Sequence, residues 1–306
     1  MIKEKNPNFS TRWVKYDNYE IVKYDNEFYI QPSADSDYEI YNPFDYSKDL
    51  LVDFLLIGRE ARLSYSRSDI YCELLSAEKT FQDMVLDFVK KYGLLGDITY
   101  APLNNTFVTE KKVYLQKPYN VQSISLEEYI SPFFKSVNNI DFNKPLTQED
   151  LLNLYGNNNP YLELGIDNIY GLAFSKKYSE KIAFIITYAR LLYDVFSDTE
   201  KYLAEEDFDK KTIYANLVSD FRPFGIGFEL DLKDKAILHW NFNSLKQAIE
   251  LILALNETND RKEVKICKHC GKPFIAKNLN AEYDTPSCRN VANVYKNREK
   301  NKEIED

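Results

Sequence analysis

Apolar residues recur every three or four positions in several long stretches, which is the spacing of a helix that buries one face. The clearest stretch runs from Ser179 to Phe196. Three others each begin at a serine suited to capping a helix: Ser47, Ser76 and Ser244. The apolar positions in these four stretches are Leu50, Leu51, Phe54, Leu55, Ile57, Phe81, Met84, Val85, Phe88, Val89, Ile182, Ile185, Ile186, Ala189, Leu192, Tyr193, Phe196, Leu245, Ala248, Ile249, Ile252 and Leu253. Together they predict a largely helical core.

Strict alternation of apolar and polar residues predicts strands between these helices. Residues 19–24 and 27–30 alternate around an Asp-Asn turn, and residues 226–232 and 236–242 alternate around Lys-Asp-Lys, so both pairs predict antiparallel hairpins. A third short hairpin is expected around residues 107–115. The acidic, proline-containing stretch 31–45 is interpreted as a surface connection. The predicted fold class is α+β, with a mostly helical main domain and short antiparallel hairpins.

The remaining helical patterns are shorter and begin at capping sequences. Residues 125–128 and 147–150 have the spacing of a capping box, and a further helix is expected over residues 209–221. A chain of 306 residues corresponds to roughly two domains. We expect a main domain over residues 1–260, with a sub-boundary near 157–178, and a small C-terminal module over residues 261–306.

Charge divides the chain at the same place. Residues 1–260 carry 28 basic and 41 acidic side chains, whereas residues 261–302 carry eleven basic and four acidic ones, a net charge of +7. A basic module beside an acidic body suggests that the module meets a polyanion, or the body itself. Part of the excess can also balance the negative charge of a metal site.

The C-terminal module holds three of the four cysteines, as Cys267-x2-Cys270 followed by Cys288. A Cys-x-x-Cys pair followed by Gly271 has the form of a zinc knuckle, because glycine accepts the positive φ that aims both thiolates at one point. Neighbouring lysines favour the thiolate forms. Three clustered cysteines and a lone Cys72 do not make a disulfide framework, which favours a reducing, cytoplasmic compartment.

The two motifs Cys267-Lys-His-Cys-Gly-Lys-Pro-Phe-Ile275 and Tyr283-Asp-Thr-Pro-Ser-Cys-Arg-Asn290 resemble the treble-clef-like zinc ribbons of bacterial proteins, including the C-terminal module of the CGNR family. That resemblance implies a structural zinc ion. It covers the last forty residues well, residues 225–262 loosely, and nothing before them. Where the ribbon has its third cysteine, this chain has Asp284, so the expected ligands are Cys267, Cys270, Asp284 and Cys288. His269 is the alternative fourth ligand, and a metal-free ribbon is a further alternative.

After Cys288 the sequence contains no helix breaker, and a helix is expected over residues 287–300. Val291, Val294 and Tyr295 are expected to pack on the ribbon. The basic side chains expected to face solvent and contact phosphates or base edges are Arg289, Lys296, Arg298 and Lys300. The alternative is a solvated basic helix with no partner.

The sequence favours a non-enzymatic protein that contacts nucleic acid, DNA rather than RNA, through this module. The family resemblance implies transcription regulation in a bacterium, with a sensing N-terminal domain. A protein-interaction component of a defence or toxin-associated system is the alternative, and a metal-dependent hydrolase or nuclease is a further one. No apolar stretch is long enough to span a bilayer, so we expect no membrane contact, and an oligomer is compatible with the sequence. His239 and Cys72 are interpreted as structural residues.

Overall fold

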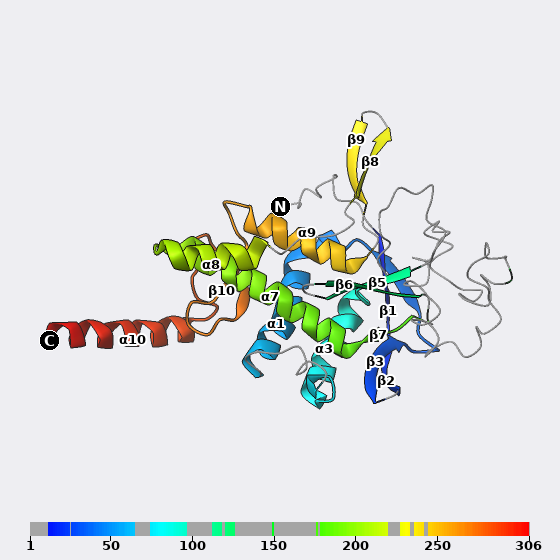
Figure 1. The fold of residues 1–306 in the computed structure, drawn as a ribbon, viewed down its shortest axis with the longest axis horizontal. Coiled ribbons are helices and arrows are strands. Elements are labelled where there is room, and N and C mark those ends of the chain that lie inside the picture. Colours follow the sequence, from blue (N-terminus) through cyan, green and yellow to red (C-terminus); the bar gives the residue numbers. More distant parts are fainter. Residues whose placement is uncertain are drawn as a thin grey trace.

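The computed structural model describes residues 12–24, 26–64, 74–96, 112–117, 120–125, 149, 176, 178–219, 227–232, 236–241 and 244–305. They form helices and small antiparallel sheets, so the α+β prediction is confirmed. Figure 1 shows the helices packed against one another at the centre, with strands at one side and a single long helix extending away at the other. None of the described helices is long and apolar enough to cross a membrane.

Two small sheets are built mainly from strands in the N-terminal part of the chain. Strand β2 (Tyr19–Tyr24) pairs with β3 (Glu27–Pro32), and the short β7 (Glu180–Lys181) joins the other edge of β3. Strand β1 (Trp13–Tyr16) pairs with β4 (Tyr38–Tyr41). The β2–β3 pair is the hairpin predicted over residues 19–30, which is therefore confirmed. The interpretation of residues 31–45 as a connection is wrong for 31–32, which end β3, and for 38–41, where Tyr-Glu-Ile-Tyr alternates like a strand; residues 43–45 belong to a short 3-10 helix.

The central helices are α1 (Ser47–Ser64), α3 (Lys79–Tyr92), α7 (Ile182–Ala204) and α9 (Leu245–Glu257). Helix α8 (Phe208–Ser219) follows α7. Helices α1 and α7 approach closely at Gly58, where an added Cβ would lie 2.0 Å from the carbonyl oxygen of Ala189. Only a residue without a side chain allows this contact.

The core lies between these helices and the N-terminal strands. Every apolar position predicted for the four helical stretches is buried except Met84, which packs partly buried against the core. Buried polar groups tie the strands to the helices: the Trp13 indole Nε1 donates to the carbonyl of Leu94 (3.0 Å), and the Tyr41 hydroxyl donates to the carbonyl of Tyr92 (2.6 Å). The buried Glu180 carboxylate accepts from the backbone N–H of Leu95 (2.8 Å).

The helix starts differ in part from the predictions. Ser244 does cap α9, because its Oγ accepts from the N–H of Gln247 (3.1 Å). Ser47 instead follows a 3-10 turn η1 (Pro43–Tyr46) whose cap is Asn42. Ser76 lies in a turn before α3, whose N-cap position is Glu78. Ser47 is thus the first residue of α1, and Glu78 takes the N-cap position expected for Ser76.

Two further hairpins each form a separate two-stranded sheet. Strands β8 (Gly227–Leu232) and β9 (Ala236–Asn241) form the predicted second hairpin. Strands β5 (Lys112–Lys117) and β6 (Asn120–Ser125) form a hairpin that lies C-terminal to the one expected around residues 107–115. Ser125 therefore ends a strand. Cys72 and most of the other predicted capping boxes lie outside the described residues, as does the side chain of His239.

The C-terminal module consists of β10 (Val264–Ile266), β11 (Pro273–Ile275) and α10 (Pro286–Glu305). The two strands pair antiparallel, with Lys265 opposite Phe274. They lie beside α1, whereas α10 projects away from the rest of the chain (Figure 1). The predicted terminal helix is confirmed and extends to residue 305.

Candidate metal centre

The Cys267–Cys270 turn is built by two backbone hydrogen bonds. The N–H of Gly271 donates to the carbonyl of Cys267 (2.9 Å), and the N–H of Cys267 donates to the carbonyl of Lys272 (2.9 Å). Gly271 has a φ of 70°, a conformation that glycine adopts without steric cost. The turn therefore reverses the chain between β10 and β11 and brings both cysteine side chains to one side.

The second arm of the site is the start of α10. The Thr285 Oγ1 accepts from the N–H of Cys288 (3.2 Å), which is the hydrogen bond of a helix N-cap. Pro286 occupies the first helical position, where its missing N–H costs nothing. These local signals place Asp284 just before the helix and Cys288 in its first turn.

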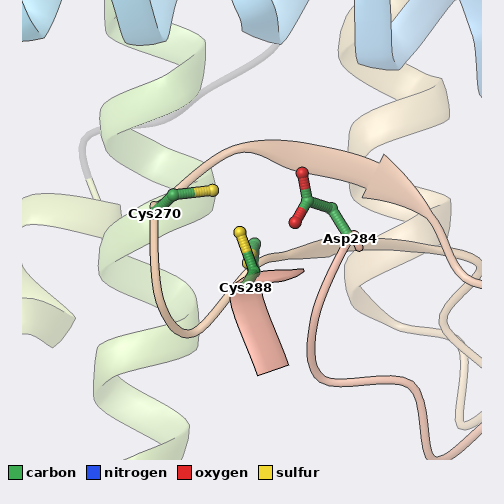
Figure 2. Close-up of side chains that lie close together, drawn as sticks. Cys270, Asp284 and Cys288 are labelled. Atoms are coloured by element: carbon green, nitrogen blue, oxygen red, sulfur yellow. The ribbon is translucent and has the colours of Figure 1, made fainter. Parts of the chain in front are cut away.

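The two arms meet at a group of four donors. One ligand atom each of Cys267, Cys270, Asp284 and Cys288 lies within 4.8 Å of the others. Figure 2 shows the side chains of Cys270, Asp284 and Cys288 converging on one point. A tetrahedral zinc ion with Zn–S bonds near 2.3 Å separates its ligand atoms by roughly 3.8 Å, so small side-chain movements suffice. The four residues can hold a metal ion.

One atom of this group fits a metal particularly well. Asp284 Oδ1 is buried and accepts no hydrogen bond from the described residues. A carboxylate oxygen withdrawn from water without a partner costs free energy, and coordination to a cation removes that cost. The donor set of three sulfurs and one oxygen is one that zinc accepts.

The acidic groups of the site shift one another's pKa values in opposite directions. Burial opposes ionisation of Asp284, but contacts with Cys288, Cys267 and Thr285 outweigh it and lower the pKa of the carboxyl. A hydrogen bond with Thr285 lowers the pKa of the Cys288 thiol, yet the contact with Asp284, burial, and the thiols of Cys270 and Cys267 raise that pKa to about 12. These opposite shifts describe an ionised carboxylate beside protonated thiols, and a divalent cation bound by the group would displace the thiol protons.

Side chains of the helical body, which is formed by α1, α3, α7 and α9, bind two backbone carbonyls of the knuckle. Arg59 of α1 donates from Nη2 to the carbonyl of Cys270 (2.6 Å), and the hydroxyl of Tyr193 in α7 donates to the carbonyl of Gly271 (2.7 Å). Burial raises the pKa of Tyr193, although the charges of Arg62 and Arg59 oppose the shift, so the hydroxyl stays a donor. The Gly271 backbone is thus fixed to the body from outside the module.

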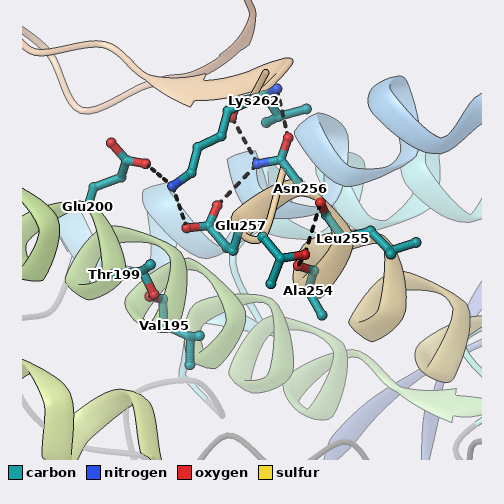
Figure 3. Close-up of polar contacts among 10 residues, drawn as sticks. Val195, Thr199, Glu200, Ala254, Leu255, Asn256, Glu257 and Lys262 are labelled. Carbon is teal, nitrogen blue, oxygen red and sulfur yellow. Dashed lines mark hydrogen bonds and ion pairs between the residues drawn. The ribbon is translucent and has the colours of Figure 1, made fainter. Parts of the chain in front are cut away.

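A charged network fixes the lead-in to the module (Figure 3). The Lys262 Nζ pairs with Glu200 of α7 (2.7 Å) and with Glu257 of α9 (2.9 Å). Asn256 bridges the end of α9 to β10, since its amide donates to the carbonyl of Val264 and its oxygen accepts from the same residue's N–H (both 3.0 Å). Burial opposes the charge of Lys262, but the two carboxylates outweigh it and raise its pKa.

Of the other residues predicted for this site, His269 lies away from the group of four. Its ring stacks on Tyr295, with centroids 6.3 Å apart and an interplanar angle of 25°. Arg289, Lys296 and Arg298 are exposed on α10, and Lys300 lies on the same helix in a part whose side chains are not described. The packing predicted for the apolar side of α10 is wrong for Val291 and Val294, which are 37% and 48% exposed, whereas Tyr295 contacts the knuckle through His269 but is still 55% exposed. The His269 ring therefore covers part of Tyr295, while Val291 and Val294 stay exposed.

The surface around the knuckle is basic. Lys268 pairs with Glu282, and its backbone N–H donates to the Glu282 carbonyl (3.0 Å). The hydrogen bond from Lys268, with the charges of Lys268, Lys296 and Lys265, lowers the pKa of Glu282. Positive side chains from β10, the knuckle and α10 therefore gather around a single carboxylate.

Sequence reasoning missed the roles of Arg59, Tyr193 and Lys262. Arg59 lies in a helix with other arginines, a pattern that predicts only ion pairs, and it does pair with Glu60. Tyr193 lies on an apolar helix face, which predicts only a core residue. The knuckle lies 211 positions after Arg59 and 78 positions after Tyr193, and nothing in the local pattern connects either residue with it. Among the described residues no second group of His, Cys, Asp or Glu side chains is arranged to hold a metal.

No protein-family model matches this chain, and the comparisons with curated proteins and with solved structures give no significant match. The resemblance to zinc ribbons therefore rests on the motif residues themselves, and the case for a metal centre rests on their geometry.

Proposed function

We propose that Cys267, Cys270, Asp284 and Cys288 bind one structural zinc ion, and that the module it stabilises contacts nucleic acid. The observation that carries this proposal is the convergence of one donor atom from each residue within 4.8 Å, together with a buried Oδ1 of Asp284 that has no hydrogen bond among the described residues. Three thiolates favour zinc over magnesium or calcium, which prefer oxygen ligands. Four protein ligands close the coordination sphere, as in structural sites, and leave no position for a substrate.

Support for nucleic acid as the partner comes from charge and exposure. Arg289, Lys296 and Arg298 are exposed on a helix that projects from the body, and Lys300 follows one turn after Lys296. Arginine and lysine on one helix supply phosphate contacts, and arginine also recognises guanine edges. DNA is the proposed polymer, and a role in transcription regulation is the family-level expectation that accompanies the ribbon.

The metal is tested by elemental analysis of the purified full-length protein. We expect about one zinc per chain, reduced strongly in Cys288→Ser and in Asp284→Ala. The matched control is Glu282→Ala, which removes an exposed carboxylate two positions from Asp284 and leaves the zinc content unchanged. Wild-type protein without stoichiometric metal contradicts the proposal.

Nucleic-acid contact is tested by titrating labelled DNA and RNA with the full-length protein at several salt concentrations. Affinity should fall steeply between about 50 mM and about 200 mM salt, because bound phosphates release counterions. Arg298→Ala should weaken binding and reduce the salt slope, whereas Lys210→Ala, an exposed charge on α8, should not. Binding that is absent at low salt, or independent of Arg298, contradicts this part of the proposal.

One observation favours a second candidate. Val291 and Val294 lie exposed on α10, and exposed aliphatic side chains on a projecting helix suit a protein partner. The alternative is therefore a protein-interaction component of a defence or toxin-associated system. It predicts co-purification of a protein that Val294→Asp releases, with no salt-dependent retention of nucleic acid.

A further inference from the structure

Two aromatic rings face solvent together beside the metal centre. His269 is exposed in the knuckle turn, and Tyr295 is 55% exposed on α10. Their planes lie 25° apart with centroids 6.3 Å from each other. The two residues come from opposite arms of the site, so the four proposed ligands that join these arms also bring the rings together.

Positive side chains flank this pair on both sides. Lys268 precedes His269 in the knuckle, and Lys296 follows Tyr295 in α10; both act on the charge of Glu282. Arg298 lies one helical turn beyond Tyr295, on the same side of α10 as Val291 and Val294. The surface therefore combines exposed ring faces, a small aliphatic area and three cations, with one carboxylate among them.

This combination matches one class of ligand. Single-stranded nucleic acids are bound by aromatic faces on which unpaired bases stack, together with cations that follow the backbone. In a duplex the base faces are already stacked, and only the base edges and phosphates are accessible. An exposed tyrosine face contributes little to a duplex contact but has a direct partner in an unpaired base.

We propose that the surface formed by Lys268, His269, Tyr295, Lys296 and Arg298 binds single-stranded nucleic acid, with one base stacked on the Tyr295 ring. This inference rests on the proposed function, because it specifies the form of nucleic acid that the C-terminal module contacts. Phosphates adjacent to the stacked base lie within reach of Lys268 on one side and of Lys296 and Arg298 on the other. The metal acts at a distance, by holding the two arms in register.

The test compares the full-length protein with Tyr295→Ala and with Tyr295→Phe. Each is titrated with a labelled oligonucleotide of about twelve nucleotides, as DNA and as RNA, and with the duplex of the same sequence. Wild type should bind the single strand more tightly than the duplex. Tyr295→Ala should weaken single-strand binding by roughly 5- to 150-fold, the usual effect of removing a stacking ring, and Tyr295→Phe should stay within about 2-fold. Zinc content should be the same in all three proteins.

Salt dependence separates stacking from charge neutralisation. Tyr295→Ala should leave the slope of log affinity against log salt unchanged, because the ring displaces no counterion. Lys268→Ala with Lys296→Ala should lower that slope by about 0.7 for each phosphate that is no longer neutralised. A single-strand affinity that is unaffected by Tyr295→Ala overturns the inference.

The remaining outcomes distinguish this inference from the function on which it rests. Tighter binding to the duplex than to the single strand overturns the inference but leaves the proposed nucleic-acid contact standing. No salt-dependent binding to any of the polymers overturns both.

Discussion

The helical body and the C-terminal module are held together by different forces. Helices α1, α7 and α9 bury most of their large apolar side chains, with Leu50, Phe54 and Phe196 fully enclosed. In the module only Val264, Cys267 and Pro273 are buried among the described residues, while Ile275, Leu279 and the apolar side of α10 are exposed. A segment of about forty residues has too little apolar surface to stabilise itself, and such segments use a metal or another cross-link.

A module that lacks a core of its own is attached to the stable body by hydrogen bonds and ion pairs. The body supplies hydrogen-bond donors from α1 and α7 and the carboxylates Glu200 and Glu257, and the module supplies the carbonyls of the knuckle and Lys262. The contact between the two therefore combines directional polar bonds with the packing of Val264 and Ile266 against the core. Removal of metal should release the module without unfolding the body.

The largest expected effect follows from metal removal. Zinc contributes about 10–16 kcal/mol to the folding of small zinc-binding peptides, so a chelator or Cys267→Ser should unfold residues 264–288. Hydrogen exchange measured by mass spectrometry should show reduced protection there and retained protection in α1 and α7. If the helical body loses protection to the same extent, the two regions are not energetically distinct.

A substitution in the helical body should instead lower the stability of the body itself. Gly58→Ala places a Cβ against the carbonyl of Ala189 and should cost about 3 kcal/mol, because the backbones of α1 and α7 must separate. Leu63→Ala, at a position that is 65% exposed, should change stability by less than about 0.5 kcal/mol. Denaturant unfolding followed by far-UV circular dichroism measures both. Equal effects of the two substitutions would contradict the close contact of the helices.

Lys262 connects the module to the body, so its substitution should lower the stability of the protein. Lys262→Met leaves the carboxylate of Glu257, whose side chain is 12% exposed, without its cation, and should cost about 1–3 kcal/mol. The control is Lys268→Met, since the pair of Lys268 with Glu282 is exposed on both sides and should matter by less than about 0.5 kcal/mol. Thermal unfolding of the zinc-loaded proteins compares them, and an equal loss of stability in both variants would argue against a buried connection.

The smallest expected effect concerns the hydroxyl that holds the knuckle. Tyr193→Phe removes the hydrogen bond to the Gly271 carbonyl, at a cost of about 1 kcal/mol, and should speed zinc release to a chelating dye by roughly fivefold. Tyr46→Phe, on a half-exposed ring outside the group of four, is the matched control. Unchanged release from Tyr193→Phe would show that the body does not stabilise the metal site through this contact.

Most helices of the body could be predicted because their burial follows a local period. The buried apolar face of α7, the capping of α9 by Ser244 and the turn at Gly271 each depend on residues that are neighbours in the sequence. The start of α1 was predicted at the right residue, whereas α3 begins after Glu78, because the expected cap Ser76 lies in a turn. The outward position of Val291, Val294 and Tyr295 was missed because periodicity identifies an apolar face without saying what covers it.

The sequence alone determined which residues are candidate ligands, since a Cys-x-x-Cys-Gly turn and a threonine-capped helix start are local features. Only the tertiary structure decided that Asp284 completes the group, that His269 stacks on Tyr295, and that Arg59 and Tyr193 hold the knuckle. The physical reason is distance along the chain. Backbone preferences act over a few residues, whereas these contacts depend on how elements far apart in the sequence pack against one another.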